Sequence, residues 1–538
     1  MAITRDQPNQ RSRFEHPALL GATLFFLTVM LYWEARYYQF VGLDDHVYVW
    51  NNPYVINGLS WQGIKYVFTN SVFSTYHPLT WLSLMADSTI FGLTPQGYHR
   101  TSITIHAVNA VLVFLILRTA TGAALPSAFV AAIFAVHPLN VEPVAWISSR
   151  KDVLSGFFFL LGLWAHCAIP TTRKYLRTAL VTAAYAFSLL AKPSVITFPL
   201  LLMLLDYWPL ARYGTPPALQ WKTILRLTVE KAPLFLILLI SLITTSQSVD
   251  NSLEANDAIS LINRMQDTAV NYAIYVGKCF APIGLSAIYP YDLRGWSALT
   301  VAGSTALLIG MTAIAWFTRR RHSFIAVGWL WYLGVLFPMS GIIIVGTHNR
   351  ADRYMYLPII GVLIVISWGC CIAAKRINLP TALLRTAAIL VVIGYTIAAW
   401  RELPNWENEK ALATKVLDAH DWNPMGHYLM GYALEGEGDI AGALKSYQEQ
   451  LRLVPLDPIP HVAIGNIQMK LARYDNAAFW YDKAVELSPN SALPLFALAE
   501  LELQRGNLPQ ARKLLERCLQ IQPYHEAARQ ALSELNAR

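Results

Sequence analysis

The sequence predicts an all-α fold in two parts, a polytopic membrane helix bundle over residues 1–400 and a helical-repeat solenoid over residues 401–538. The first observation is composition: 55% of the 538 residues are hydrophobic and only 14% are charged, which is far more apolar than an ordinary soluble protein. The second is that long apolar runs recur up to Trp400 and then give way to a 34-residue repeat. The formal net charge of +8 comes mostly from short loops between apolar runs, so it indicates membrane topology and no nucleic-acid partner. The five cysteines show no metal or redox spacing.

The apolar runs predict about eleven membrane spans. They lie near residues 19–38, 101–117, 125–136, 153–168, 176–190, 194–210, 233–246, 297–317, 324–345, 356–373 and 383–400. The first outer loop, about 41–100, has the mixed aromatic and polar composition of interfacial helices. Residues 247–296 suit either a re-entrant or interfacial helix or two short spans, and we favour the former.

The basic loops predict the orientation. With the N-terminus inside, simple alternation puts the loops with Arg319-Arg320-Arg321 and Lys375-Arg376 inside as well. The first outer loop and everything after Arg401 then lie outside, on the periplasmic face if the membrane is a bacterial inner membrane. An even number of spans would move the repeats to the cytoplasm.

Three sets of positions share the repeat period in the last part of the chain. They are Gly431, Gly465 and Ala499; Ala443, Ala477 and Ala511; and Pro455, Pro489 and Pro523. This is the pattern of tetratricopeptide repeats, in which small residues let paired helices approach closely and Pro ends the second helix. We predict about three full repeats with flanking helices, and a groove over residues 424–523 suited to an extended peptide. The alternative is that the repeats only stabilise or oligomerise the protein.

Two adjacent carboxylates, Asp44 and Asp45, follow the first predicted span closely. Acidic side chains this near a membrane helix are candidates for function, although Asp44 could instead cap the next helix. One carboxylate could act as a base while its neighbour orients it. Alternatively, the two could hold a divalent metal ion.

Several cations lie on the predicted outer side, against the orientation bias, and so need a local reason. A phosphate group near the membrane surface supplies one, because Arg and Lys bind phosphate oxygens. Structural ion pairs of Arg150 with Asp152, or of Lys151 with Glu142, are the alternative. Asp206 lies toward the inner side and is left out of the site. The candidate phosphate contacts are Arg150, Lys151, Lys192, Arg350 and Arg353, and the candidate supporting residues are His77, His137, Glu142, Asp152 and Tyr354.

Several motifs together resemble the transmembrane and tetratricopeptide repeat-containing protein O-mannosyltransferases, in the form of a bacterial relative. The motifs are Leu43-Asp44-Asp45, Tyr76-His77-Pro78-Leu79-Thr80-Trp81, His137-Pro138 through Arg150-Lys151-Asp152, Leu190-Ala191-Lys192-Pro193, Asp206-Tyr207-Trp208-Pro209 and Arg353-Tyr354-Met355-Tyr356-Leu357-Pro358. The resemblance implies a C-type glycosyltransferase (GT-C) fold, with Asp44 or Asp45 as the catalytic carboxylate. It also implies an inverting transfer from a polyprenyl-phosphate-linked sugar to Ser or Thr of a protein acceptor. The chain has only about three full repeats where eukaryotic members usually carry more, so mannose is not assumed.

Other functions remain open at the level of sequence. An oligosaccharide ligase of the same superfamily would use the same kind of site. A transporter would be expected to place its charges at mid-span. A non-enzymatic membrane scaffold would use only the repeats, for partner binding.

Overall fold

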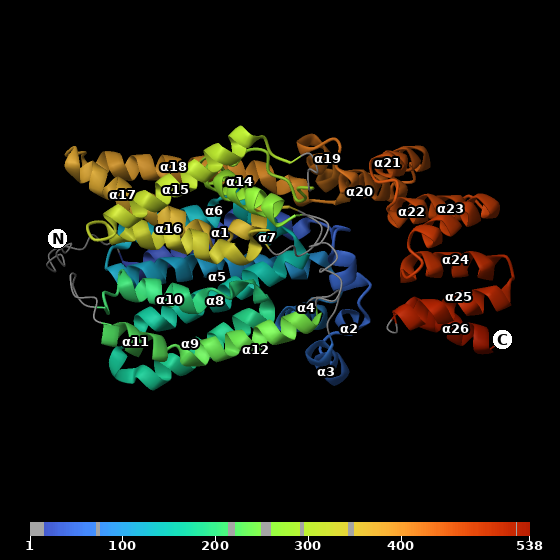
Figure 1. Cartoon of the computed structure of the whole chain (residues 1–538), viewed down its shortest axis with the longest axis horizontal. Helices are drawn as coiled ribbons and strands as arrows, with labels where there is room; N and C mark the ends of the chain where they lie inside the picture. The colour runs from blue at the N-terminus through green and yellow to red at the C-terminus, as the bar shows by residue number, and fades with distance from the viewer. Residues whose placement is uncertain are drawn as a thin grey trace. The chain divides into compact units, whose positions relative to one another are not determined.

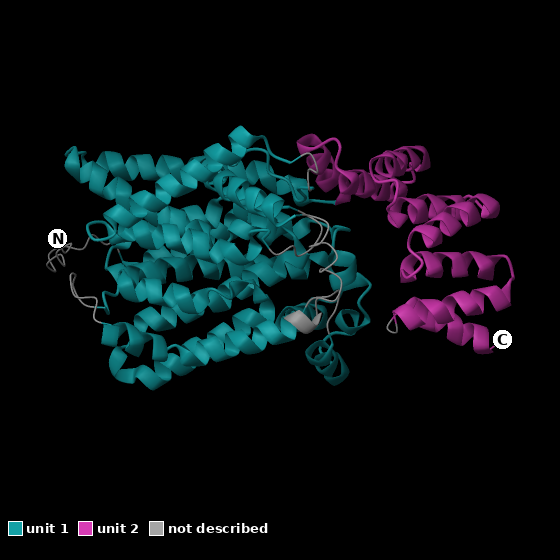
Figure 2. Cartoon of the chain, viewed as in Figure 1, with its two compact units in different colours: residues 1–408 teal, residues 409–538 magenta. Residues whose placement is uncertain are grey.

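The structure, a computed structural model, describes residues 16–70, 76–213, 221–248, 260–290, 295–342, 349–522 and 525–537. These residues form helices and turns, with one isolated bridge between Tyr289 and Arg350, so the predicted all-α class is confirmed (Figure 1). The chain divides into two compact units, residues 1–408 and 409–538 (Figure 2). The predicted boundary at residue 400 falls inside a helix that continues to Glu402.

The first unit is a bundle of long helices that run side by side (Figure 1). The helices of the bundle are α1 (Pro17–Tyr32), α5 (Pro95–Thr121), α6 (Ala124–Val136), α8 (Arg150–Ala168), α9 (Lys174–Ala191), α10 (Phe198–Tyr207), α12 (Ala232–Ser248), α14 (Leu261–Phe280), α15 (Ala298–Thr318), α16 (Ser323–Leu336), α17 (Ile359–Arg376) and α18 (Thr381–Glu402). The helices of the connecting segments are α2 (Pro53–Ile56), α3 (Trp61–Thr69), α4 (Pro78–Phe91), α7 (Val141–Ala145) and α11 (Trp221–Val229). Single turns include the π-helix η3 (His46–Trp50) and the 3-10 helices η2 (Trp33–Tyr37), η4 (Pro138–Asn140), η5 (Ile147–Ser149), η6 (Thr171–Arg173), η7 (Pro193–Val195), η8 (Phe337–Met339), η9 (Asp352–Met355) and η10 (Leu403–Trp406).

Among the described residues, five helices are long and apolar enough to cross a membrane, or up to eight if each bent helix pair counts as one span. Two shorter apolar helices, Pro193–Tyr207 and Ser323–Met339, add to these. In the most apolar windows of α15 and α18 only 6% of the residues are buried in the protein, as expected for helices whose side chains face lipid. The first unit is therefore an integral membrane domain, while the number eleven stays a prediction.

The bundle has two ends, which we name after the aspartates they carry. At the Asp45 end, the backbone N–H of Ser148, before α8, donates to Asp45 at 2.9 Å. At the Asp206 end, the Tyr207 hydroxyl, at the end of α10, donates to the Arg319 carbonyl after α15 at 3.0 Å. The loops predicted to be outer thus meet at one end, and the basic loops predicted to be inner meet at the other.

The region with two predicted alternatives, residues 247–296, contains one helix in its described part. This helix, α14, lies against the end of α16: the Thr268 hydroxyl donates to the Ser340 carbonyl at 2.9 Å, and the Tyr272 hydroxyl to the Leu333 carbonyl at 3.0 Å. The choice between a re-entrant or interfacial helix and two short spans stays a prediction.

Short helices fill the first loop at the Asp45 end. Ser60 caps α3 by accepting a hydrogen bond from the Gly63 N–H at 3.1 Å, a common helix start. The Trp61 side chain of α3 is 78% exposed and Phe68 is 43% exposed. Exposed aromatic residues on a short amphipathic helix suit the interface of a bilayer.

The second unit is a stack of helix pairs at the predicted period. The pairs are α20 (Pro424–Gly436) with α21 (Ile440–Leu453), α22 (Pro458–Lys470) with α23 (Tyr474–Leu487), and α24 (Ala492–Gln504) with α25 (Leu508–Ile521), flanked by α19 (Glu409–Ala419) and α26 (Glu526–Ala537). Pro455 and Pro489 each follow the second helix of a pair, whereas Pro523 lies outside the described residues. The prediction of about three repeats with flanking helices matches these elements.

Close helix contact explains the repeated small residue. A Cβ built on Gly431 would overlap the ring of Tyr447, and one built on Gly465 would overlap the ring of Tyr481. Each tyrosine is buried, and its hydroxyl donates back to the first helix of its own pair, to Glu435 or Asn466. The glycine and the tyrosine therefore act as one packing unit.

We expect Gly465→Val to destabilise the repeat array by about 1–3 kcal/mol, because the added side chain forces the Tyr481 ring out of a filled site. Thermal unfolding of the full chain, followed through a repeat-specific probe such as hydrogen exchange of α22 and α23, measures the loss. Gly436→Ala is the matched control, since nothing lies within 4 Å of a Cβ at that position. Equal protection in the two variants would contradict the packing argument.

Candidate functional site

Asp45 fastens the first loop to the segment before α8. Its Oδ2 accepts a hydrogen bond from the Val41 N–H at 3.0 Å, and its Oδ1 accepts one from the Ser148 N–H at 2.9 Å. The Ser148 hydroxyl donates to the same Oδ1. Asp45 is 1% exposed, and this burial raises its pKa to about 6 in spite of the three donors. Asp45 therefore holds two distant segments at a fixed separation.

Asp44 is the accessible member of the acidic pair. Its side chain is 45% exposed, and its Oδ2 lies 3.7 Å from Lys151 Nζ. That ammonium also donates to the Tyr48 hydroxyl at 3.3 Å and lies 4.6 Å from the centre of the Tyr48 ring. Tyr48 stacks on Trp81 with ring centres 4.6 Å apart. The solvent-accessible carboxylate of Asp44 thus lies beside the ammonium group of Lys151, which contacts the Tyr48 ring.

Lys192, directly after α9, brings a second cation to this end. Its Nζ lies 2.6 Å from Oδ1 of Asp152, in the first turn of α8. Burial lowers the pKa of Lys192, and the adjacent carboxylate opposes that shift. The Thr80 hydroxyl donates to the Ala191 carbonyl at 2.9 Å, so α4 is tied to the residue that precedes Lys192.

His77 lies near these groups, and its own side chain is uncharged. Its Nδ1 is 3.5 Å from the Tyr48 hydroxyl. Burial, together with the charges of Lys151 and Lys192, lowers its pKa well below the usual range. His77 can accept or donate a hydrogen bond here, but it does not add positive charge.

Arg353, in η9, is the third cation. Its guanidinium forms an ion pair with Glu142 of α7, and its backbone N–H donates to Glu142 Oε2 at 3.0 Å. Its Cζ lies 5.2 Å from the ring centre of Trp146, and Lys151 Nζ lies 5.7 Å from the same ring. Both distances are within the range of cation–π attraction. Trp146 therefore links the two cations.

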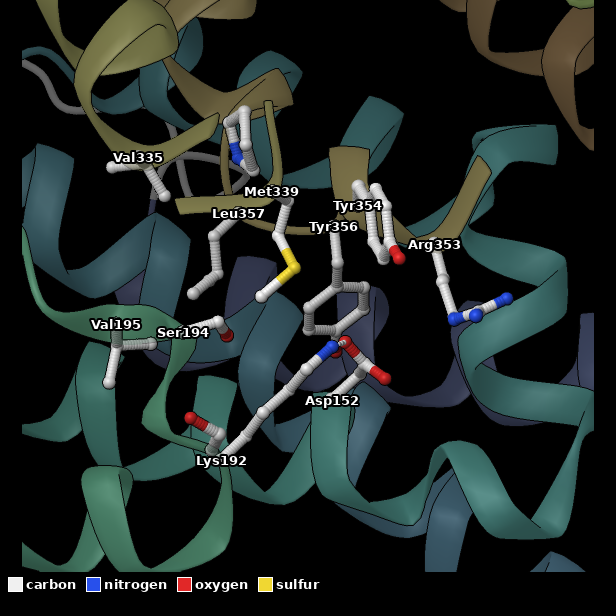
Figure 3. Close-up of a pocket in the computed structure, with 12 residues that line it drawn as sticks. Asp152, Lys192, Ser194, Val195, Val335, Met339, Arg353, Tyr354, Tyr356 and Leu357 are labelled. Atoms are coloured by element: carbon white, nitrogen blue, oxygen red, sulfur yellow. Dashed lines mark hydrogen bonds and ion pairs between the residues drawn. The ribbon is translucent and has the colours of Figure 1, made fainter. Parts of the chain in front are cut away.

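A pocket opens among these charged groups (Figure 3). Asp152 and Lys192 meet at its centre from two different elements, with the ring of Tyr354 nearby, and Arg353 lines one side with its guanidinium turned away from Lys192. Apolar side chains complete the lining, chiefly Val195, Val335, Met339 and Leu357. The pocket thus has one charged wall and one apolar wall.

Arg150 is placed elsewhere. Its guanidinium is fully buried, 2.8 Å from Asp87 Oδ2, and donates to the hydroxyls of Ser83 and Ser102 at 2.8 and 2.9 Å. The ion pair of Arg150 with Asp152, which the sequence offered as an alternative, is not formed, because Asp152 pairs with Lys192. Because its charge is neutralised inside the protein, we leave Arg150 out of the phosphate contacts proposed below.

Arg350 and His137 also lie apart from the pocket. The Arg350 guanidinium lies over the rings of Tyr289 and Trp296, with Cζ 4.3 and 5.9 Å from their centres. His137 caps η4 by accepting from the Leu139 N–H, and its Nε2 faces the Cys279 carbonyl at 3.2 Å. The structure gives His137 a structural position and puts Arg350 in a separate aromatic cluster.

Three residues of this end are absent from the predicted site: Tyr48, Trp146 and Ser148. Tyr48 and Trp146 hold cations, and Ser148 anchors Asp45. Trp146 and Ser148 lie in sequence between Glu142 and Lys151, two predicted site residues. This proximity in sequence is the signal that could have identified them.

The acidic pair does not form a prebuilt metal site. No group of three or more His, Cys, Asp or Glu side chains with the spacing of a metal site occurs within the described part of the chain. Both Asp45 oxygens already accept hydrogen bonds, and Asp44 turns toward Lys151. The predicted divalent ion therefore remains a prediction, and no step below depends on it.

The raised pKa of Asp45 predicts a pH-dependent stability. Because the folded chain holds this proton more tightly than the unfolded chain, the stabilisation is complete below pH 4 and is lost as pH rises through about 6. The free-energy difference between the wild type and Asp45→Asn should change by about 3 kcal/mol over this range. Thermal unfolding of both proteins between pH 4 and 7 measures it. A difference independent of pH would contradict the burial of an ionisable Asp45.

Comparison with known proteins agrees with the two-part organisation. Two tetratricopeptide repeat family models match residues 428–492 and 494–535. Over most of the chain, the human protein O-mannosyl-transferase TMTC3 is 22% identical across 510 residues, covering 85% of this chain and 54% of the relative. Human TMTC4 is 23% identical across 432 residues, covering 70% and 58%. Drosophila melanogaster Tmtc1 is 33% identical across 132 residues, covering 24% and 15%. These matches confirm the predicted resemblance.

The comparisons also set limits. The chain spans about half the length of the curated relatives that it matches over most of its residues. Among solved structures, a chain from the crystal structure of the APC/C hetero-tetramer Cut9-Hcn1 aligns over 85% of this chain and 89% of its own length, at a TM-score of 0.24 and 13% identity.

Proposed function

We propose that this chain is a membrane-embedded glycosyltransferase. It moves a sugar, with inversion, from a polyprenyl-phosphate-linked donor to Ser or Thr hydroxyls of a protein acceptor. The observation that carries the proposal is the meeting of the accessible Asp44 with Lys151, Lys192 and Arg353 at one end of the bundle. The relatives named protein O-mannosyl-transferases support the same reaction class.

The geometry divides the work between the two aspartates. Asp44, whose side chain is 45% exposed and whose ion pair with Lys151 is long at 3.7 Å, takes the proton of the acceptor hydroxyl. The hydroxyl oxygen attacks the anomeric carbon, and the bond from that carbon to the phosphate oxygen breaks, so the electron pair leaves with the lipid phosphate. Asp45 is a positioning residue, because its oxygens hold the loop through Val41 and Ser148.

The cations act on the leaving phosphate. Lys151, Lys192 and Arg353 are each less than 15% exposed, and a positive charge in such a poorly solvated site stabilises a developing anion more strongly than in water. Each is partly neutralised by its own carboxylate, so the donor phosphate competes with Asp44, Asp152 or Glu142 for the cation. The apolar wall of the pocket suits the prenyl chain.

The repeats are proposed to recruit the acceptor. Tyr432, Asn466 and Glu500 occupy equivalent positions on the first helices of the three pairs, and all three are exposed. A regular series of exposed polar groups suits an extended polypeptide. We place both the Asp45 end and the repeats on the outer, periplasmic face of a bacterial inner membrane, following the basic inner loops.

Two other functions make different predictions. An oligosaccharide ligase would transfer a chain of sugars where the proposed enzyme transfers one. A scaffold would need the repeats alone, so loss of Asp44 would leave it intact. The test is mass spectrometry of outer-compartment proteins from cells that carry the wild-type chain, Asp44→Asn or no chain.

The proposal expects a single hexose on Ser or Thr that is present only with the wild-type chain. Glu534→Gln is the control, because Glu534 is exposed on α26, outside the proposed groove over residues 424–523. An unchanged pattern of modified proteins in all cells would overturn the proposed function. A lost oligosaccharide would replace it with the ligase.

A further inference from the structure

Only one of the two oxygens of the Asp152 carboxylate has a hydrogen-bond partner in the described part of the chain. Its Oδ1 lies 2.6 Å from Lys192 Nζ, but its Oδ2 is buried and has no hydrogen-bond partner. Asp152 as a whole is 8% exposed. Buried charged oxygens without a donor are rare and costly in folded proteins. This oxygen therefore needs an explanation of its own.

The position of Asp152 in the fold explains its charge but leaves Oδ2 unexplained. It lies in the first turn of α8, where the helix dipole favours an anion. Lys192 then neutralises it across the gap between α8 and the end of α9. Both interactions would be satisfied by a carboxylate with one bound oxygen.

The surroundings of Asp152 identify the missing partner by its chemistry. Asp152 lines the pocket together with Lys192 and Arg353, two of the proposed phosphate contacts (Figure 3). A phosphate cannot face Oδ2, because both groups are acceptors with negative charge. The group that completes Oδ2 must be a hydrogen-bond donor, and it must arrive next to a phosphate. In a sugar phosphate the ring hydroxyls satisfy both conditions.

We infer that Asp152 Oδ2 accepts a hydrogen bond from a hydroxyl of the donor sugar, so that Asp152 determines which sugar the enzyme uses. This inference rests on the proposed function, because it takes the lipid phosphate to sit at Lys192 and Arg353. Lys192 has two tasks in this arrangement, since it orients Asp152 and contacts the phosphate. The sugar ring then lies between the charged wall of the pocket and Asp44, the carboxylate that takes the proton of the acceptor hydroxyl.

The test compares two probes that differ only in the sugar: a short-chain polyprenyl phosphate and its mannosyl form, each titrated against the purified full chain. In Asp152→Asn, we expect the affinity for the mannosyl form to fall about 10- to 100-fold, since a hydrogen bond to a charged group is lost. The affinity for the bare polyprenyl phosphate should stay the same or rise, because a negative charge beside Lys192 has been removed. Glu534→Gln, the exposed control on α26, should change neither.

The outcomes separate the inference from the proposed function. If Asp152→Asn weakens both probes equally, Asp152 only positions Lys192, and if it weakens neither, Asp152 contacts no hydroxyl of the donor sugar. Either result overturns the inference while the proposed function stands. If the wild type binds neither probe, the proposed function and the inference fall together. Lys192→Met should lower the affinity for both probes, because both carry the phosphate that Lys192 contacts.

A second measurement decides the case if Asp152→Asn does not fold. Wild-type binding is measured with mannosyl donors that each lack one ring hydroxyl. One deoxy donor should bind about 10- to 100-fold more weakly than the parent. Equal affinities for the whole series would overturn the inference, because no hydroxyl would then be recognised.

Discussion

Replacement of Asp44 by Asn should lower the kcat of sugar transfer by about 10²- to 10⁴-fold, the usual contribution of a general base. The amide keeps the shape of the side chain but cannot take the acceptor proton. The fold should be unaffected, because Asp44 is 45% exposed and its one ion pair is long, at 3.7 Å. Donor affinity should stay the same or rise, since Lys151 gains freedom to bind the phosphate. Steady-state transfer, donor binding and thermal unfolding of the full chain measure the three quantities.

Glu534→Gln is again the control, and it should match the wild type in all three measurements. Asp44→Asn with more than a tenth of wild-type kcat would show that another group takes the proton. In that case Asp45, with its raised pKa, becomes the first candidate. The positioning role assigned to Asp45 would then be wrong.

Replacement of Asp206 by Ala should destabilise the membrane unit by about 3–5 kcal/mol, because it leaves the buried Lys231 without its counter-ion. Asp206 is fully buried, 2.8 Å from His166 Nε2 and 2.9 Å from Arg212 Nη1, and it also pairs with Lys231. These partners come from α8, from the loop after α10 and from the junction of α11 and α12. The cluster fastens the Asp206 end of the bundle.

Thermal unfolding in detergent, with ligand-free protein, measures this loss. A surface replacement such as Glu534→Gln should stay within about 0.5 kcal/mol of the wild type. If Asp206→Ala kept wild-type stability but lost sugar transfer, the cluster would belong to the reaction. The exclusion of Asp206 from the site would then be wrong.

The regular parts of the fold were predictable because their sequence signals are periodic. The 34-residue spacing located the helix pairs of the second unit, since Gly431 and Gly465 must be small to accept the rings of Tyr447 and Tyr481. The apolar runs located the long helices of the first unit. Helix ends were less accurate: α5 begins at Pro95, whereas the apolar run began near residue 101, because polar residues can continue a helix beyond its apolar stretch.

The pairing of the charged residues was not predictable. Sequence proximity suggested Arg150 with Asp152 and Lys151 with Glu142. In the structure Arg150 pairs with Asp87, and Glu142 pairs with Arg353. Residues two apart on a helix do not face each other, so Arg150 and Asp152 at the start of α8 point to different partners. The true partners are distant in sequence and meet only through the packing of the bundle.

The candidate site was therefore predicted in part. The acidic pair, Lys151, Lys192 and Arg353 are brought to one end of the bundle, whereas Arg150, Arg350 and His137 are engaged elsewhere. The predicted outward position of a cation could not distinguish a charge that faces a pocket from one that is neutralised inside the protein. That distinction depends on burial and on distant partners.

One measurement tests the central claim most directly. The purified full chain is incubated with a short-chain polyprenyl phosphate that carries radiolabelled mannose and with a Ser/Thr-containing peptide from an outer-compartment protein. We expect label to move to a peptide hydroxyl with release of polyprenyl phosphate, and no transfer when Lys151, Lys192 and Arg353 are replaced together by Met. Label that stays on the lipid with the wild-type chain, or that moves equally well with the triple variant, would contradict a lipid-phosphate sugar site at the Asp45 end.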